Sequence, residues 1–306
     1  MGAALPPSQI LQALLSIPKQ DDVELCPIGR SELKRSCPLP FFEASDFIEM
    51  DESPVRALKE KKEASMLLGM RLLKEGKIDA LISAGSTPAL VLGSKTILST
   101  LPKIKRPALF SYFPTKKDPV AVLDLGANVE CKAVHYVQFA QMAASYLLVN
   151  GMENPRLGLL NIGEESSKGT VELRKAYKEL QTIENPPFQF CGNVEGTCVF
   201  DGTVDALITD GFTGNVFLKT AEGIASLILD RLSESLDAKL ADLQKHLHYA
   251  EYPGALLLGI NGIVIKSHGY SSKKAIINAV HGAIALVKKD FLKSFSEQLK
   301  NKVNYE

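Results

Sequence analysis

The residues best suited to chemistry in this chain are hydroxyl, amide and amino side chains that stand beside glycines after short apolar runs. Two stretches share this pattern: Ile78–Leu90 reads IDALISAGSTPAL, and Val204–Val216 reads VDALITDGFTGNV. In each, a short buried strand is followed by Gly, Thr and the start of a helical repeat. Such a turn places backbone N–H groups at the positive end of a helix dipole, which suits phosphate. We therefore predict an anion pocket.

The pocket needs several donors that converge, because each charge-assisted hydrogen bond adds only ~1.5–3 kcal/mol. We expect Lys168, Lys266 and His268 to supply positive charge. The predicted donors share a position just after a strand, and they are Ser83, Gly85, Ser86, Thr87, Thr213, Gly214 and Asn215.

Acidic and amide side chains follow the ends of further predicted strands. These candidate supporting residues are Asp124, Asn128, Asn161, Glu164, Glu165, Asn193, Glu195 and Asp210. Glu164 and Glu165 could act as a general acid and base, or could simply favour the first turn of a helix. No His, Cys and Asp cluster has the spacing of metal ligands, so no metal is expected.

Other catalytic motifs are weak or missing. Cys131 and His135 are four residues apart and could be a nucleophile and its base, or a plain thiol and a surface imidazole. No GxGxxG follows a strand, and neither GxxxxGK[ST] nor GxSxG occurs. A dinucleotide fingerprint, a P-loop and a nucleophile elbow are therefore not supported.

The elements that must position these residues alternate between strands and helices, as in a doubly wound α/β fold with a mostly parallel sheet. Ligands of such folds bind at the carboxyl ends of the strands. Expected strands are Val23–Ile28, Phe47–Met50, a strand from Ile78, Pro107–Pro114, Pro119–Leu125, Leu157–Ile162, Phe188–Cys191, Ala206–Ile208 and Gly262–Gly269. Expected helices are Met1–Ile17, Ser53–Glu75, Lys132–Val149, Thr170–Thr182, one from about Thr213, Ser235–His248 and Lys273–Phe291.

Two connections carry specific expectations. The strands Pro107–Pro114 and Pro119–Leu125 are close enough to pair as an antiparallel hairpin, and Tyr249–Gly259 is expected to be a loop. A strand normally opens this kind of fold, and none is predicted before the first helix. No Ser-, Gly- or Pro-rich linker divides the 306 residues, so we expect one α/β domain over 1–306 with an amphipathic excursion at 232–255.

Composition limits the functional class. Lys plus Arg and Asp plus Glu both number 35, and Trp is absent, which argues against charge-driven binding of nucleic acid. The five cysteines are scattered, as expected for free thiols in a reducing cytosol. No signal peptide and no apolar run of ~18 residues is present, so we expect a cytoplasmic protein.

Several motifs, in this order, resemble the bacterial phosphate acyltransferase (PlsX) family from about Met50 to Ala283. They are SAGSTPAL (83–90), LDLGANVECK (123–132), VQFAQMAASY (137–146), NPRLGLLNIGEESSKG (154–169), GNVEG (192–196), DGFTGNVFLKTAEG (210–223) and GINGIVIKSHG (259–269). The resemblance implies an enzyme that moves a long-chain acyl group from acyl carrier protein to inorganic phosphate, giving acyl phosphate for phospholipid synthesis. It also implies a three-layer α/β/α fold like that of phosphotransacetylases and isocitrate dehydrogenases.

The resemblance further implies a homodimer without a bound cofactor that contacts the inner face of the cell membrane. The Leu236–Tyr252 stretch is the expected contact, and glycerol-3-phosphate acyltransferase is a possible partner. Acidic carrier protein would dock on basic surface such as Arg56–Lys62 or Lys103–Lys117. Within the expected site, Lys168, His268 and Asn215 are the catalytic candidates.

The chain also departs from the family pattern, which leaves other functions open. Ala3 and Ala4 stand where the family has Gly and Asp, and Ser86 and Pro88 replace Asn and Gly. The alternatives are a short-chain phosphate acyltransferase that uses acyl-CoA, a dehydrogenase of the same broad fold, and a non-catalytic relict that binds acyl carrier protein or membrane.

Overall fold

A computed structural model describes residues 5–232, 254–267 and 272–302, and its backbone contacts divide the chain into two compact units. Unit 1 comprises Met1–Thr100 and Ala250–Leu292, and unit 2 comprises Leu101–Tyr249 and Lys293–Glu306. The predicted single domain is not tested by this division and stays a prediction. The expected excursion at 232–255 and the helix Ser235–His248 lie almost wholly outside the described residues.

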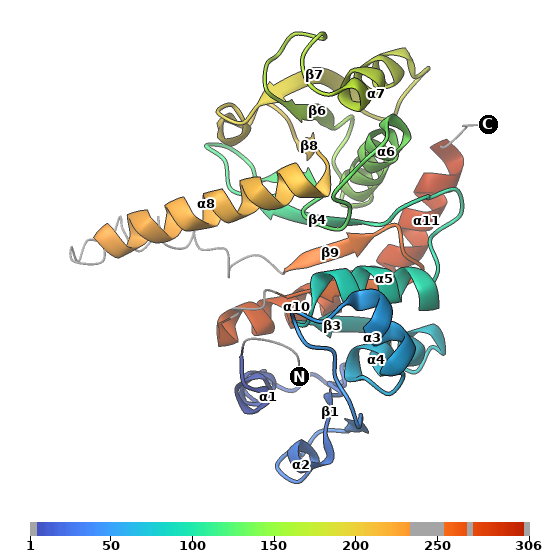
Figure 1. Cartoon of the computed structure of the whole chain (residues 1–306), viewed down its shortest axis with the longest axis vertical. Helices are drawn as coiled ribbons and strands as arrows, with labels where there is room; N and C mark the ends of the chain where they lie inside the picture. The colour runs from blue at the N-terminus through green and yellow to red at the C-terminus, as the bar shows by residue number, and fades with distance from the viewer. Residues whose placement is uncertain (1–4, 233–253, 268–271, 303–306) are drawn as a thin grey trace. The chain divides into compact units, whose positions relative to one another are not determined.

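Unit 1 is an α/β unit in which β3 pairs in parallel with β10, and β10 pairs antiparallel with β9 (Figure 1). A separate parallel pair joins β1 to β2. The helices of unit 1 are α1 (Pro7–Leu15), α2 (Ser31–Lys34), α3 (Pro54–Glu60), α4 (Ser65–Lys74), α5 (Thr87–Ile97) and α10 (Lys273–Lys288). Its strands are β1 (Ile28–Gly29), β2 (Phe42–Glu43), β3 (Ala80–Ser83), β9 (Ala255–Leu258) and β10 (Ile263–Lys266).

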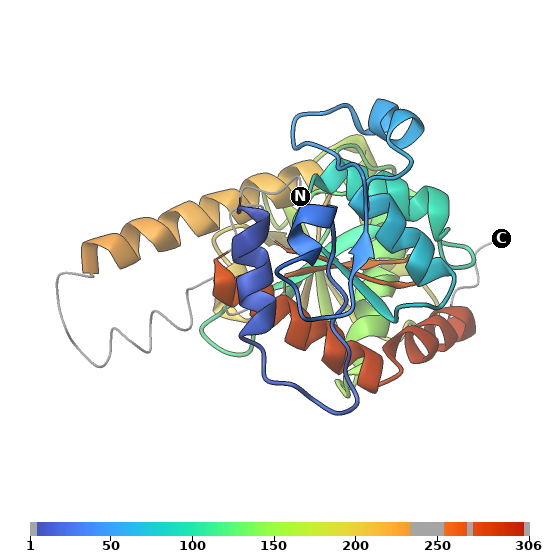
Figure 2. The same cartoon turned by 90° about the horizontal axis from the view of Figure 1, so that it is seen from below.

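Helices cover the sheet of unit 1 because each turns an apolar stripe inward. α1 packs on α10 and α4 packs on α5, and Figure 2 shows α1, in dark blue, beside α10, in red. Gly93 of α5 permits the second contact, because a Cβ there would lie 2.9 Å from the sulfur of Met70 on α4. Both α4 and α10 also contact β3, which fixes the strand that carries the Ser83 loop.

Unit 2 has a sheet in the order β4-β5-β8-β6-β7, in which β4 pairs antiparallel with β5 and the other pairs are parallel. Its strands are β4 (Ala108–Phe113), β5 (Val120–Leu123), β6 (Arg156–Asn161), β7 (Gln189–Glu195) and β8 (Ala206–Ile208). Its helices are α6 (Ala133–Val149), α7 (Val171–Thr182), η1 (Val199–Asp201) and α8 (Gly211–Leu232), with α11 (Phe291–Lys302) beginning at the unit boundary.

The core of unit 2 explains why two of its strands, β5 (VAVL) and β8 (ALI), are apolar at every position. All residues of β5 and β8 are buried, as expected for central strands that are covered on both faces. α6 contacts β5 and β8 and is buried along most of its length, including Phe139 and Met142. Helices flank the strands of each unit, so the predicted α/β class with a mostly parallel sheet is confirmed.

The predicted hairpin of β4 and β5 is confirmed, whereas several other local predictions are wrong. Tyr249–Gly259 was expected to be a loop but contains β9. Phe47–Met50 was expected to be a strand, whereas the strand in this region is β2, in the preceding Pro-rich segment. Val23–Ile28 contributes only Ile28 to β1. β9 was not predicted because its run ALLL is short, and the local pattern does not reveal that this run pairs with β10.

The predicted helix Ser53–Glu75 is two helices, α3 and α4. Lys61 leaves the helical conformation, and its Nζ donates to the Phe47 carbonyl oxygen at 2.9 Å and to Glu52 Oε2 at 2.8 Å. The next residues then pair with another segment, since the Ser65 N–H donates to the Asp46 carbonyl oxygen. These long-range contacts outweigh the local preference for one continuous helix.

Candidate functional site

Four parallel strands of unit 2 end at one edge of its sheet, which is where ligands of open α/β sheets bind. β5 is followed there by Asp124, β8 by Asp210, and β6 by the loop that carries Lys168, while β7 ends at Glu195. Figure 1 shows β6, β7 and β8 together in this unit. The structure therefore brings most of the predicted acidic and amide residues to a common edge.

Asp124 is the centre of the turn after β5. Its side chain is fully buried, and burial raises its pKa, opposed by hydrogen bonds from Ala127, Leu109 and Asn128. The carboxylate accepts five hydrogen bonds, from the N–H groups of Leu109 (2.9 Å), Gly126 (3.2 Å), Ala127 (3.0 Å) and Asn128 (2.7 Å) and from Asn128 Nδ2 (2.8 Å). Asp124 and Asn128 therefore shape the loop and are not free to act on a substrate.

Asp210 plays a similar part at the start of α8. Its carboxylate accepts from the Thr213 N–H at 2.8 Å, from Thr213 Oγ1 at 3.0 Å and from the Tyr136 hydroxyl at 3.1 Å. The N–H groups of Gly211 and Gly214 donate to the carbonyl oxygens of Asn128 and Asp210. Three of the first four N–H groups of this helix, and the Thr213 hydroxyl, are thus already bonded, so Asn215 is the main predicted donor left at this turn.

Asn215 joins α8 to the turn after β5. Its Nδ2 donates to the Leu125 carbonyl oxygen at 3.3 Å, and a Cβ on Gly126 would lie 2.8 Å from the same nitrogen. Gly126 has a φ of +130°, which favours glycine in its own right. Gly214 is packed more tightly still, because a Cβ there would fall on the Asp124 carbonyl oxygen. Asn215 is exposed on its outer side, where a ligand could reach it.

The loop after β6 holds Lys168 through a network of amides. Asn161 Nδ2 donates to Asn193 Oδ1 at 3.1 Å and to the Lys168 carbonyl oxygen at 3.3 Å, and Asn193 Nδ2 donates to the Glu165 carbonyl oxygen at 2.8 Å. The Lys168 side chain is 46% exposed, with its Nζ 3.9 Å from Glu165 Oε1. Lys168 is therefore a cation on a fixed loop that is open to solvent.

The contacts of this edge do not form a catalytic pair of carboxylates from Glu164, Glu165 and Glu195. Glu164 and Glu165 offer their carbonyl oxygens to Asn193, and the Glu165 side chain faces Lys168. Glu195 ends β7 beside Asn161 of β6. The carboxylates of this edge thus lie near a cation or near loop amides.

Unit 1 has its own strand-end edge, formed by β3 and β10. Lys266 lies opposite Ser83 in the parallel register, and the Ser267 N–H donates to the Ser83 carbonyl oxygen at 2.9 Å. The Lys266 side chain is buried, and its Nζ donates to the Ser267 carbonyl oxygen. Ser83 and Lys266 are thus brought together as predicted.

The loop after β3 leads into α5. The Gly85 N–H donates to Ser83 Oγ at 3.3 Å, Ser86 is buried at the start of the helix, and Thr87 is its first residue. Pro88 removes one N–H from the first turn, which leaves fewer backbone donors there than in a glycine variant of the loop. His268, the remaining predicted catalytic residue, lies outside the described residues.

The alternative interpretation of Cys131 and His135 as nucleophile and base is wrong. α6 begins at Ala133, so the two residues do not share a helical face, and His135 Nδ1 accepts the Lys132 N–H at 3.0 Å. Burial, followed by the nearby charges of Asp124 and Asp210, raises the pKa of the Cys131 thiol to about 12. A thiol with so high a pKa is protonated at neutral pH and is a poor nucleophile.

We expect Cys131→Ser to keep most of the acyltransferase activity and to change the free energy of unfolding by no more than ~1 kcal/mol. Since the thiolate forms only as the pH approaches 12, alkylation of Cys131 in the folded protein at pH 8 should be at least ~100-fold slower than that of free cysteine. Mass spectrometry after timed iodoacetamide treatment measures this rate. Rapid alkylation of Cys131, together with loss of activity in Cys131→Ser, would support the interpretation of Cys131 as a nucleophile.

The sequence did not single out Tyr136, although its hydroxyl holds Asp210 in place. Burial raises the pKa of Tyr136, and the Asp210 charge raises it further, so the phenol stays protonated and donates. Tyr136 is an ordinary member of a buried helix in the sequence, and no local pattern distinguishes it.

In the part of the chain that the structure describes, no three His, Cys, Asp or Glu side chains are grouped to hold a metal ion. Nor is any described helix long and apolar enough to cross a membrane.

Solved structures share this fold at low sequence identity. The branched-chain phosphotransacylase of Enterococcus faecalis superposes with a TM-score of 0.63 at 11% identity, covering 94% of this chain and 96% of that one. The EutD phosphotransacetylase of Staphylococcus aureus gives a TM-score of 0.58 at 17% identity, covering 96% and 91%. The fold thus places the protein among α/β proteins of the phosphotransacetylase type, with polar strand-end loops at the expected ligand position.

Sequence comparison then identifies the family. A family described as "Fatty acid synthesis protein" matches residues 1–294. A phosphate acyltransferase of Thermotoga maritima is 40% identical over 294 residues, which cover 92% of this chain and 89% of that protein. The chain belongs to the PlsX family of phosphate acyltransferases.

Proposed function

We propose that this protein transfers a long-chain fatty acyl group from acyl carrier protein to inorganic phosphate, and that the acyl phosphate serves phospholipid synthesis. The observation that best supports the proposal is the strand-end edge of unit 2. There Lys168 stands on a loop fixed by Asn161 and Asn193, and Asn215 stands on a helix start fixed by Asp210. A dianion held at this edge would meet a fixed positive charge and an amide donor.

The reaction needs the protein to hold phosphate beside a thioester and to stabilise the charge that develops on the carbonyl oxygen. A phosphate oxygen attacks the thioester carbon, a C–O bond forms, and the tetrahedral intermediate then breaks its C–S bond. The proton that phosphate gives up leaves with the carrier's sulfur as a thiol. We assign Lys168 to charge neutralisation and Asn215 to donation toward the phosphate or the oxyanion.

Unit 1 carries its own group of residues that we propose for phosphate contact, at the strand-end edge of β3 and β10. We assign Ser83, Gly85, Ser86 and Thr87 to phosphate contact and Lys266 to charge, with His268 or Lys168 aiding departure of the thiolate. Thr213 and Gly214 keep their proposed place at the start of α8. Donation from the Thr213 hydroxyl to phosphate requires that hydroxyl to turn away from Asp210, which also accepts the Thr213 N–H.

Lys168→Ala is expected to lower kcat/KM for phosphate by about 100-fold, which is typical for loss of one preorganised charged donor. Lys168→Arg should retain more of the activity, since it keeps the charge. Lys175→Ala is a matched control. Lys175 is an exposed lysine on α7, the helix that follows the Lys168 loop, and in the described contacts it pairs only with Glu172. Initial rates over a phosphate titration give kcat and KM. Equal losses of kcat/KM in Lys168→Ala and Lys175→Ala would show that Lys168 is not part of the site.

The function itself is tested by measuring free thiol released from palmitoyl-acyl carrier protein with and without inorganic phosphate. Phosphate-dependent release, with acyl phosphate recovered in equal amount, is the expected result. Preference for short-chain acyl-CoA would replace the proposed donor, and saturable binding of carrier protein without release would support a relict. Saturable binding of a nicotinamide cofactor would instead support the dehydrogenase alternative.

We also propose a homodimer that works at the inner face of the membrane and delivers its product to a glycerol-3-phosphate acyltransferase. Support for association comes from α8, whose large apolar side chains remain exposed at Val216, Ile224 and Leu227. Sedimentation of the full chain tests the dimer. The membrane contact proposed at Leu236–Tyr252 lies outside the described residues and is tested by flotation with anionic vesicles.

A further inference from the structure

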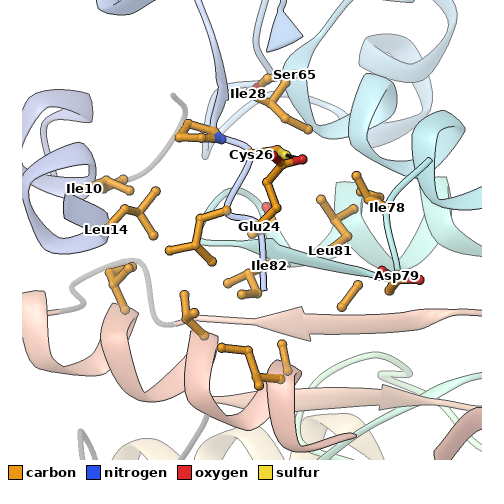
Figure 3. A pocket seen from close by; sticks show the side chains of 18 of the residues that line it. Ile10, Leu14, Glu24, Cys26, Ile28, Ser65, Ile78, Asp79, Leu81 and Ile82 are labelled. Atoms are coloured by element: carbon orange, nitrogen blue, oxygen red, sulfur yellow. Dashed lines mark hydrogen bonds between the residues drawn. The ribbon is translucent and has the colours of Figure 1, made fainter. Parts of the chain in front are cut away.

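A hydrogen bond between two helices of unit 2 is not explained by the proposed acyl transfer, and neither is the cavity of unit 1 (Figure 3). The cavity has a volume of about 510 Å³ and a mainly apolar lining. The hydrogen bond runs from the N–H of Ala133, the first residue of α6, to Glu172 Oε2 in the first turn of α7, at 2.8 Å. It joins two segments of the proposed phosphate site, because α7 follows the Lys168 loop and α6 carries Tyr136.

Glu172 supplies a cap that the start of α6 lacks. The residue before this helix is Lys132, which is a poor capping residue and whose positive charge is unfavourable beside a helix amino terminus. The first turn of α6 contains no acidic residue. The hydrogen bond from Ala133, followed by one from Lys175, lowers the pKa of Glu172, so a full negative charge faces this helix end at neutral pH. Lys175 contacts the other carboxylate oxygen, Oε1, at 2.9 Å, so the two contacts are separate.

Glu172 belongs to the same hydrogen-bonded segment as Lys168, which lies four residues earlier. Thr170 lies between them and caps α7, since its hydroxyl accepts a backbone N–H of the first turn at 3.2 Å. The Arg174 guanidinium donates to the carbonyl oxygen of Gly169, the residue after Lys168. Any movement of the Lys168 loop is therefore tied to the turn that holds Glu172.

The other end of this connection is the start of α8. Tyr136 is the fourth residue of α6, and its hydroxyl donates to Asp210 Oδ2 at 3.1 Å. Asp210 also accepts the N–H and the hydroxyl of Thr213, which lies two residues before Asn215. Two hydrogen bonds at the start of α6 thus connect the Lys168 segment with the turn that carries Asn215.

We propose that Glu172 is a positioning residue for acyl transfer, because it fixes the start of α6 and thereby the place of Asn215 relative to Lys168. This role rests on the proposed function, in which Lys168 and Asn215 hold the phosphate. Glu172 acts through Ala133 and Tyr136 rather than on the substrate. The phosphate dianion has to meet its cation and its amide donor at once, and a misplacement of about 1 Å in a site can cost 100-fold in rate.

Glu172→Ala is expected to lower kcat/KM for phosphate by about 10-fold and to leave KM for the acyl carrier substrate within about twofold, since the displaced groups contact phosphate. The variant removes the acceptor of the Ala133 N–H, so the first turn of α6 frays and the start of α8 loses its support. Glu172→Gln keeps an amide oxygen as acceptor and should stay within about threefold of the wild type. Glu179→Ala, which removes an exposed carboxylate from the same helix, is the matched control and should have no effect.

A double variant tests whether Glu172 acts through Tyr136. Tyr136→Phe removes the hydroxyl that holds Asp210 and should by itself lower kcat/KM for phosphate by about 10-fold. If both residues support one turn, the double variant of Glu172→Ala and Tyr136→Phe also loses about 10-fold, whereas independent effects would multiply to about 100-fold. A loss equal to the product of the two single losses would overturn the proposal.

Hydrogen exchange measures the bond to Glu172 without the reaction. Exchange of the Ala133 amide should be at least ~10-fold faster in Glu172→Ala than in Glu179→Ala, and Glu172→Gln should restore the protection. If the wild-type protein releases no thiol in response to phosphate, the proposed function fails and this role fails with it. If the wild type is active and Glu172→Ala matches Glu179→Ala in kcat/KM, the proposal for Glu172 alone is overturned.

Discussion

Asp124→Ala is expected to destabilise the protein by about 4 kcal/mol or more and to abolish acyl transfer. The substitution leaves five donors around the turn after β5 without their acceptor, in a site that is fully buried. Each buried unsatisfied group costs ~1–3 kcal/mol, although such costs do not add fully. Urea denaturation measures the loss, and thiol release from the folded fraction measures the activity.

Two further variants separate the hydrogen bonds from the loss of charge. Asp124→Asn keeps an acceptor for Leu109, Gly126 and Ala127 but turns an amide toward the donors of Asn128, so we expect a loss of about 2 kcal/mol. Asp118→Ala removes an exposed carboxylate just before β5 and should change stability by less than ~0.5 kcal/mol. If Asp124→Ala proved as stable as Asp118→Ala, the turn would not depend on this carboxylate.

The strand-end site was predictable because its signals are local. Apolar runs such as VAVL and ALI, each followed by Asp and Gly, predict buried strands with polar turns, and both strands are found. Parallel pairing then brings Asp124, Asp210 and the Lys168 loop to one edge, as expected from strand polarity alone. The resemblance to a known family supplied the chemistry, which these residue types alone do not determine.

The roles within the site were less predictable because they depend on contacts between distant segments. Thr213 was predicted to donate to phosphate, yet its N–H and its hydroxyl both donate to Asp210 three residues earlier. Tyr136 holds Asp210 from α6, 74 residues away in sequence. No spacing rule links two residues so far apart, so a single sequence gives no sign of this contact.

Errors in the fold have the same origin. The break between α3 and α4 follows from Lys61 reaching Phe47 and Glu52, and β9 exists because β10 pairs with it. In both places the local pattern alone favours another structure, a continuous helix or a loop. Tertiary contacts decide between such alternatives where the local preference is small.

Gly214→Ala is expected to lower acyl transfer by at least ~100-fold, because it displaces the start of α8. A Cβ at this position would lie much closer to the Asp124 carbonyl oxygen than the 3.0 Å that real Cβ atoms keep, and 2.9 Å from Thr209 Cγ2. The neighbour is backbone and cannot turn away, so the helix start that carries Asn215 must shift. A misplacement of about 1 Å in a site can cost 100-fold in rate.

Gly223→Ala tests whether that loss reflects the close approach rather than the change of residue. Gly223 lies on the same helix, and a Cβ there would meet nothing within 4 Å. We expect this variant to keep its activity and to gain up to ~1 kcal/mol in stability, because Ala favours the helix over Gly. Activity of Gly214→Ala within twofold of Gly223→Ala would mean that the α8 start adapts without affecting the site. The close approach of Gly214 to Asp124 would then serve packing alone, and within unit 2 the phosphate would have to be held by the loop that carries Lys168.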